Sequence, residues 1–116
     1  MITIYHNPRC TKSRECLDEI ENLNQPFKVR KYLDEPFTKV ELEEVIKKLN
    51  IHPIELVRTK ESIWIENYKG KQLTDEEIID ALLLYPKLIE RPIVVIGNKA
   101  IIARPKEKIN ELLQQF

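Results

Sequence analysis

Cys10 is the residue of this chain whose type and position are most directly suited to chemistry. It comes just after the turn-forming pair Asn7-Pro8, and the segment from Thr11 onward is predicted to be helical. The free amides and the dipole of a helix N-terminus stabilise negative charge, so a thiol placed there ionises well below its usual pKa of about 8.5. The thiolate is a nucleophile, which makes Cys10 a candidate catalytic residue. The alternative interpretation is a small apolar side chain that fills the junction between a strand and a helix.

Three polar side chains near Cys10 in the sequence could assist its ionisation. Thr11 and Ser13 offer hydroxyl donors to the sulfur. His6, at the end of the preceding strand, could add a donor or a positive charge. These residues are therefore candidate supports for a thiolate at Cys10.

Cys16, the second cysteine, is predicted to have a structural role. It lies about 9 Å further along the helix axis and on another face. A disulfide needs Cα atoms within about 7 Å of each other, so no bridge to Cys10 is expected, and Cys16 falls on the apolar stripe of the helix. Because the sequence Cys10-Thr11-Lys12-Ser13 lacks the second cysteine of a dithiol centre, an outside thiol would have to complete a redox cycle.

Three arginines, Arg58, Arg91 and Arg104, are candidate ligands for an anion. Arg91 and Arg104 each precede a proline, which restricts their backbones to extended conformations at the two ends of a predicted hairpin. Guanidinium groups bind tetrahedral oxyanions through paired hydrogen bonds. The alternative for each arginine is an ordinary solvated charge.

The composition excludes several other classes of function. Lys plus Arg and Asp plus Glu each number 19, and this zero net charge argues against broad binding to nucleic acid or to an anionic membrane. The two histidines and two cysteines have no spacing typical of a metal site, so no metal is expected. We find no signal peptide, no apolar run of about 20 residues and no unused apolar stripe, and therefore expect a cytoplasmic monomer.

Hydrophobic periodicity and turn signals predict the elements that would position these residues. Capping-box sequences at Thr38–Glu41 and Thr74–Glu77 predict the starts of two helices, and Gly97-Asn98 predicts a hairpin turn. We expect a surface loop over 59–73, in which Trp64 packs against the core or the loop. The other expected elements are strands over 2–5, 27–32, 92–96 and 99–103, a helix from near Thr11, a short helix from Pro53, and a final helix from Pro105 to Phe116. This order is typical of an α/β arrangement with one sheet.

The segment ITIYHNPRCTKSR at residues 2–14 resembles the N-terminal active-site segment of the glutaredoxin-linked arsenate reductases. RPIVV at residues 91–95, followed by Arg104-Pro105, resembles that family's second signature, and LVR at residues 56–58 resembles a third. The resemblance implies a thioredoxin-like fold of the α/β class: strand, helix, strand, a helical insertion at about 38–90, a β-hairpin and a C-terminal helix. It also implies a single domain over residues 1–116.

The resemblance further implies roles for the candidate residues. Cys10 would be the nucleophile, His6 would help to hold it as a thiolate, and Pro92 would be a cis proline facing the thiol. The protein would bind no cofactor, glutathione would be the co-substrate, and glutaredoxin would resolve the mixed disulfide formed on Cys10. The residues expected to bind arsenate and its reduced product are Arg58, Arg91 and Arg104.

Two alternatives remain open at this stage. In the first, the chain is a glutathione-linked thiol oxidoreductase whose substrate is a protein disulfide or another oxyanion. In the second, it is a redox regulator that binds the α subunit of RNA polymerase, a function that the same fold serves elsewhere. Related regulators commonly carry a Cys-x-x-Cys switch, and here Ser13 stands at the second cysteine position, which disfavours that alternative.

Overall fold

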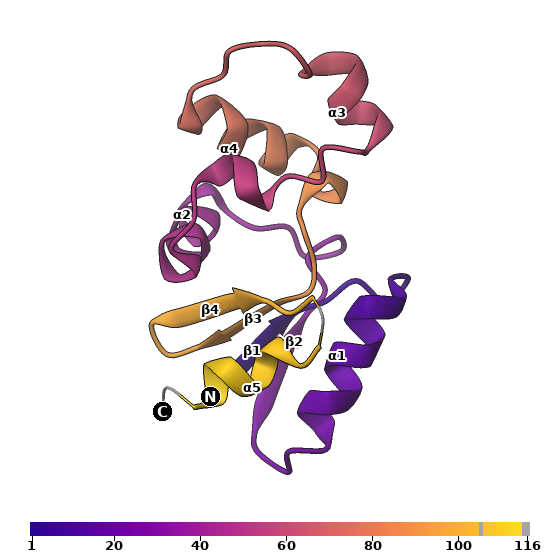
Figure 1. The fold of residues 1–116 in the computed structure, drawn as a ribbon, viewed down its shortest axis with the longest axis vertical. Coiled ribbons are helices and arrows are strands. Elements are labelled where there is room, and N and C mark those ends of the chain that lie inside the picture. The colour runs from indigo at the N-terminus through magenta and orange to yellow at the C-terminus, as the bar shows by residue number, and fades with distance from the viewer. Residues whose placement is uncertain (105, 115–116) are drawn as a thin grey trace.

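Four short strands form one mixed sheet in the order β2-β1-β3-β4 (Figure 1). The central strand β1 (Ile2–Tyr5) runs parallel to β2 (Phe27–Arg30) and antiparallel to β3 (Ile93–Ile96). A tight turn then leads to β4 (Lys99–Ile102), which pairs antiparallel with β3. The structure confirms the four predicted strands and their predicted order along the chain.

Helical segments connect and follow these strands. The structure, a computed structural model, describes residues 1–104 and 106–114, so the predicted helical positions Pro105 and Phe116 lie outside the described residues. The α-helices are α1 (Thr11–Glu21), α2 (Lys39–Leu49), α3 (Ser62–Asn67), α4 (Asp75–Leu84) and α5 (Lys108–Leu113). Two short 3-10 helices are η1 (Pro53–Leu56) and η2 (Pro86–Leu88).

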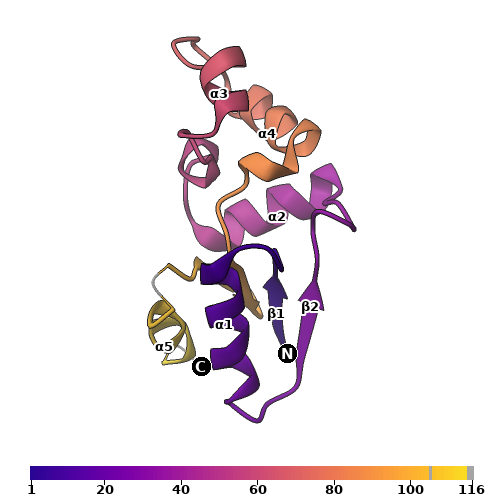
Figure 2. The same ribbon diagram turned by 90° about the vertical axis from the view of Figure 1, so that its right-hand side faces the viewer.

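The two faces of the sheet contact different sets of helices. Successive side chains of a strand point to opposite faces, so Val94 packs with α1 and α5, whereas Ile93 and Val95 pack toward α2 and α4. Figure 2 shows α1 and α5 beside the sheet, with α3 and α4 at the far end of the long axis. The molecule is accordingly elongated, with principal extents of 44 × 26 × 23 Å. No helix within the described residues has the length and apolar character needed to cross a bilayer.

Local sequence signals account for the starts of α2 and α4. The hydroxyl of Thr38 accepts a hydrogen bond from the backbone N–H of Glu41, whose carboxylate accepts one from the Thr38 N–H. Thr74 and Glu77 form the same reciprocal pair at α4. Each cap satisfies two amides that the first turn of a helix leaves unpaired, which confirms both predicted helix starts.

The prediction of a surface loop over 59–73 is wrong in its central part, where α3 forms. Its N-cap residue, Glu61, makes no side-chain cap, so the usual sequence signal of a helix start is missing. The helix is stabilised instead by burial of Trp64, whose ring stacks on Tyr68 at 5.1 Å between centroids and joins the core beside α4. Tertiary packing therefore determines this helix, and polar neighbours conceal it in the sequence.

Replacing Trp64 by alanine is expected to lower the free energy of unfolding by about 3–5 kcal/mol, because it removes a large buried ring and leaves a cavity. Ile65→Ala is the matched control: Ile65 is exposed, and its truncation should change stability by less than about 0.5 kcal/mol. Urea denaturation followed by circular dichroism measures both. Equal, small losses for the two variants would contradict the placement of Trp64 in the core.

Candidate active site

The backbone places Cys10 at the N-cap of α1. Its φ of −95° and ψ of 122° are extended, while its carbonyl already accepts the first helical hydrogen bond, from Arg14 N–H at 3.0 Å. A second bond, from Cys10 N–H to the carbonyl of Asn7 at 3.0 Å, closes the turn that leads out of β1. The thiol is partly exposed at this end of the sheet, where the first amides of α1 point toward it.

Several groups act on the Cys10 thiol, and their net effect favours the thiolate. Burial raises the pKa of Cys10, but this is outweighed by hydrogen bonds from the backbone N–H of Ser13 and the Arg91 side chain. The positive charge of Arg91 and the backbone N–H of Lys12 lower the pKa further, so that it lies below its ordinary value. A lowered thiol pKa is the electrostatic condition for a nucleophilic cysteine near neutral pH.

The sequence suggests that the hydroxyl groups of Ser13 and Thr11 donate hydrogen bonds to the Cys10 sulfur, but in the structure both oxygens are bound to other groups. Ser13 Oγ lies 2.6 Å from His6 Nδ1 and accepts a hydrogen bond from the backbone N–H of Asn7 at 3.0 Å. Thr11 Oγ1 accepts a bond from the Arg14 guanidinium at 3.3 Å. Backbone amides of α1 therefore stabilise the thiolate, and the Ser13 hydroxyl fixes the loop that holds it.

His6 is buried at the end of β1, and its surroundings disfavour a positive charge. Burial lowers the pKa of its imidazole, as do the charges of Lys31 and Arg14, against a smaller opposite effect of Ser13. The Nδ1 atom of the neutral ring can accept a hydrogen bond from the Ser13 hydroxyl. His6 thus orders the turn around Cys10 through Ser13 rather than as a neighbouring cation.

Replacing Ser13 by alanine should destabilise the fold by about 1–3 kcal/mol, since it leaves the buried Asn7 N–H and His6 Nδ1 without their partner. Ser62→Ala is the control, because Ser62 is exposed at the start of α3. Urea denaturation of the two variants beside the wild type checks this. If Ser13→Ala were as stable as the control, the hydrogen bonds of the Ser13 hydroxyl would contribute nothing to the turn.

Arg91 presents unpaired hydrogen-bond donors beside the thiol. The peptide bond between Arg91 and Pro92 is cis, as the resemblance implied, and lies just before β3. The Arg91 Nε and Nη1 atoms are both buried, and neither has a hydrogen-bond partner among residues 1–104 and 106–114. Buried guanidinium N–H groups are rarely left unpaired, so this arrangement is suited to an anionic acceptor that completes it.

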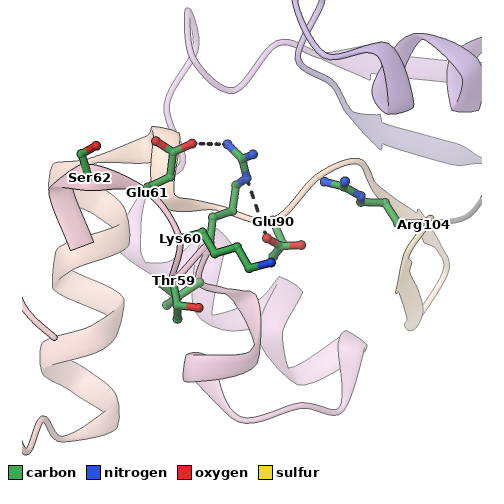
Figure 3. Close-up of a pocket in the computed structure, with 8 residues that line it drawn as sticks. Thr59, Lys60, Glu61, Ser62, Glu90 and Arg104 are labelled. Carbon is green, nitrogen blue, oxygen red and sulfur yellow. Dashed lines mark hydrogen bonds and ion pairs between the residues drawn. The ribbon is translucent and has the colours of Figure 1, made fainter. Parts of the chain in front are cut away.

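Arg58 and Arg104 come together at a neighbouring pocket of about 460 Å³. Arg58 follows η1, and Arg104 follows β4 and points toward Glu90 (Figure 3). Cys10 and Arg91 are not among the lining residues, which are Val57, Arg58, Thr59, Lys60, Glu61, Ser62, Glu90 and Arg104. The structure therefore places the three candidate arginines in two adjoining groups, Arg91 with the thiol and the other two at the pocket.

Two carboxylates form ion pairs with the Arg58 guanidinium. Arg58 Nη1 donates to Glu61 Oε1 at 2.5 Å, and its Nε lies 3.8 Å from Glu90 Oε1 (Figure 3). The second oxygen of Glu61 lies 3.8 Å from the Lys87 ammonium. Arg58 is thus held in place by two acidic residues that the sequence did not mark as part of a site.

Comparison with known proteins shows the family to which the chain belongs. A family model described as the ArsC family matches residues 5–112. The chain belongs to the ArsC family. Within this family, a Haemophilus influenzae protein named arsenate reductase is 40% identical over 115 residues, which cover 97% of this chain and 98% of that protein. The Escherichia coli protein YfgD, named uncharacterized, is 40% identical over 114 residues, which cover 97% of this chain and 96% of YfgD.

A solved ArsC-type structure supports the same assignment. The Vibrio cholerae structure titled arsenate reductase matches this chain with a TM-score of 0.89 at 39% identity, covering 95% of both chains. The ArsC chain described here therefore has the thioredoxin-like fold predicted from its sequence. Within its described residues, no cluster of three or more histidine, cysteine or acidic side chains could hold a metal ion.

Sequence analysis missed several residues of this ArsC site. Asn7 was noted only as a turn former, although its backbone N–H bonds Ser13 and its side chain accepts from Arg9 N–H at 3.0 Å. Tyr32 and Glu90 come from segments with no motif of their own. Tyr32 comes near the thiol, and Glu90 comes near Arg58, only when the chain has folded. No spacing in the sequence could therefore have identified them.

Proposed function

We propose that this chain reduces arsenate to arsenite with glutathione and glutaredoxin, using the Cys10 thiolate as its nucleophile. The observation that carries the proposal is Arg91, whose buried Nε and Nη1 have no partner among the described residues although the side chain lies beside a thiol of lowered pKa. A tetrahedral oxyanion bound there would supply the missing acceptors and place its central atom next to the sulfur. Relatives named arsenate reductase support an oxidoreductase of this kind.

The proposed chemistry begins at the sulfur. The Cys10 thiolate forms a bond to arsenic, and one arsenate oxygen leaves as water after taking protons from solvent. The thiol of glutathione then joins Cys10 in a disulfide, its proton passes to an arsenic oxygen, two electrons remain on arsenic, and arsenite departs. A glutaredoxin thiolate attacks the glutathione sulfur and restores Cys10.

The arginines are proposed to bind and orient the oxyanion. Arg91 donates to oxygens of the group bonded to Cys10, where its fixed charge also stabilises the charge that develops during attack. Arg58 and Arg104 would hold the arriving arsenate and the departing arsenite at the adjoining pocket. Because Cys16 is buried and its pKa is raised to about 12, it is not proposed to take part.

A coupled assay tests the proposal. We expect arsenate-dependent consumption of NADPH by the wild-type protein when glutathione, glutaredoxin and glutathione reductase are all present. Omission of arsenate, of glutaredoxin or of the protein itself should each return the rate to background. Absence of turnover, with Cys10 still alkylated rapidly near neutral pH, would exclude arsenate as substrate and favour a thiol oxidoreductase with another substrate. A cytoplasmic location, where glutathione keeps thiols reduced, is part of the proposal.

A further inference from the structure

Tyr32 carries a buried hydroxyl group that the fold leaves without a partner. The residue follows β2, its side chain is 1% exposed, and its ring lies 6.0 Å from that of Phe37. The Tyr32 hydroxyl has no hydrogen-bond partner within the part of the chain that the structure describes. Burial of an unpaired hydroxyl is unfavourable, so a hydroxyl retained in such a place suggests an acceptor that arrives with a ligand.

Tyr32 lies at the end of the sheet that carries Cys10 and Arg91. Burial raises the pKa of Tyr32 to about 12, and the charges of Arg91, Cys10, Arg58 and Glu90 all act on it. The register of the sheet brings these segments together: Tyr5, at the end of β1 that leads to Cys10, pairs with Arg30 on one side and with Ile93 on the other. Tyr32 and Arg91 therefore lie at the same end of the sheet as the thiol. At neutral pH the hydroxyl therefore keeps its proton and can donate a hydrogen bond.

Tyr32 and Arg91 together present three buried donors that have no acceptor within residues 1–104 and 106–114: the phenol O–H, Arg91 Nε–H and an Arg91 Nη1–H. A tetrahedral oxyanion beside the Cys10 sulfur offers several acceptor oxygens at once. We propose that the Tyr32 hydroxyl donates a hydrogen bond to an oxygen of the oxyanion held beside Cys10, as a third donor together with the Arg91 guanidinium. This inference rests on the proposed function, since it names a further residue that touches the same substrate.

If the proposal is right, Tyr32→Phe weakens oxyanion binding without lowering thermal stability. Removal of a hydroxyl with no partner in the fold should leave the thermal midpoint unchanged or raise it. Loss of a hydrogen bond to an anion should weaken oxyanion binding by about tenfold or more. A merely structural role would instead lower stability and binding together.

Protection of Cys10 from alkylation measures binding without requiring turnover. Iodoacetamide modification would be followed at increasing concentrations of arsenate, phosphate and sulfate, each used separately as the probe. Tyr5→Phe is the matched control, because the Tyr5 ring also packs on Phe37, at 4.7 Å, while the charges that act on its hydroxyl belong to Glu41, Arg30 and Glu44. Thermal unfolding without anion would be recorded for all three proteins.

The expected result is a dissociation constant raised about tenfold or more in Tyr32→Phe alone, with no loss of thermal stability. Equal constants in the wild type and Tyr32→Phe would overturn the inference, as would a loss of affinity accompanied by a loss of stability. If no anion protects the wild type, the inference and the proposed oxyanion site both fail. If an anion protects but arsenate is not reduced, only the proposed function fails, and the comparison of constants for that anion still decides the role of Tyr32.

Discussion

Replacing Cys10 by serine is expected to reduce arsenate-dependent turnover by at least about 10³-fold, to the background of the assay. The substitution changes one atom, yet the groups that lower the pKa of the thiol cannot ionise a serine hydroxyl near neutral pH. A neutral hydroxyl is a weak nucleophile, and the Nδ1 of His6 is engaged by Ser13. The coupled NADPH assay measures the loss, and mass spectrometry should show no fast-alkylating site in the variant.

Cys16→Ala is the control for this prediction. Cys16 is fully buried between α1 and the sheet, and burial raises the pKa of its thiol, so it should neither react rapidly nor contribute to turnover. The variant should keep its activity and lose a modest amount of stability from the small cavity. Turnover that survives in Cys10→Ser and disappears in Cys16→Ala would reverse the assignment of the nucleophile.

Replacing Arg91 by methionine should lower kcat/KM by about 10²–10³-fold, which is the usual effect of removing one preorganised donor to a developing charge. Two losses combine in this variant. The Cys10 thiol loses a hydrogen bond and a nearby positive charge, so its pKa should rise. The oxyanion loses the two buried N–H groups that have no other partner among the described residues. Methionine retains much of the side-chain volume, which limits the effect on packing.

The rate of iodoacetamide alkylation against pH separates these two losses. In Arg91→Met the midpoint of the profile should move to higher pH, because the thiolate has lost a stabilising cation. Arg9→Met is the control: Arg9 directly precedes Cys10 in the sequence, but its side chain is exposed and is not among the groups that act on the thiol. An unchanged profile in Arg91→Met would show that the helix amides alone determine the ionisation of Cys10.

The parts of the fold that depend on local interactions were predictable from the sequence. The reciprocal caps at Thr38 and Thr74 involve side chains only three residues apart, and the hairpin turn at Gly97 follows from neighbouring residues. The helix around Trp64 was not predictable in this way. It depends on contacts with residues distant in the sequence, and propensity does not report such contacts.

The positions of the main site residues were predictable from the sequence, but their hydrogen-bond and ion-pair partners were not. The position of Cys10 at a helix start follows from the order of the elements, and Arg91 was marked by the proline after it. The partners of the Ser13 hydroxyl could not be inferred, because His6 Nδ1 and the Asn7 N–H come within reach of it only when the turn has formed. The pairing of Arg58 with Glu90 likewise depends on how η1 meets the segment before β3, where Val57 bridges Ile89.

If the pocket binds arsenate as proposed, the ion pairs around Arg58 mean that the arriving oxyanion has to replace a carboxylate of the chain itself. Glu61 belongs to the same chain, so its carboxylate would compete with an arriving anion for Arg58 at a high and constant effective concentration. A weakly interacting monoanion such as chloride gains too little to displace it, whereas a dianion with several acceptor oxygens can. Lys87 already lies near the second oxygen of Glu61, so the displaced carboxylate keeps a cation and the exchange leaves no charge unpaired. The proposed function therefore implies that occupancy of this pocket would depend on the charge density of the incoming anion as well as on its concentration.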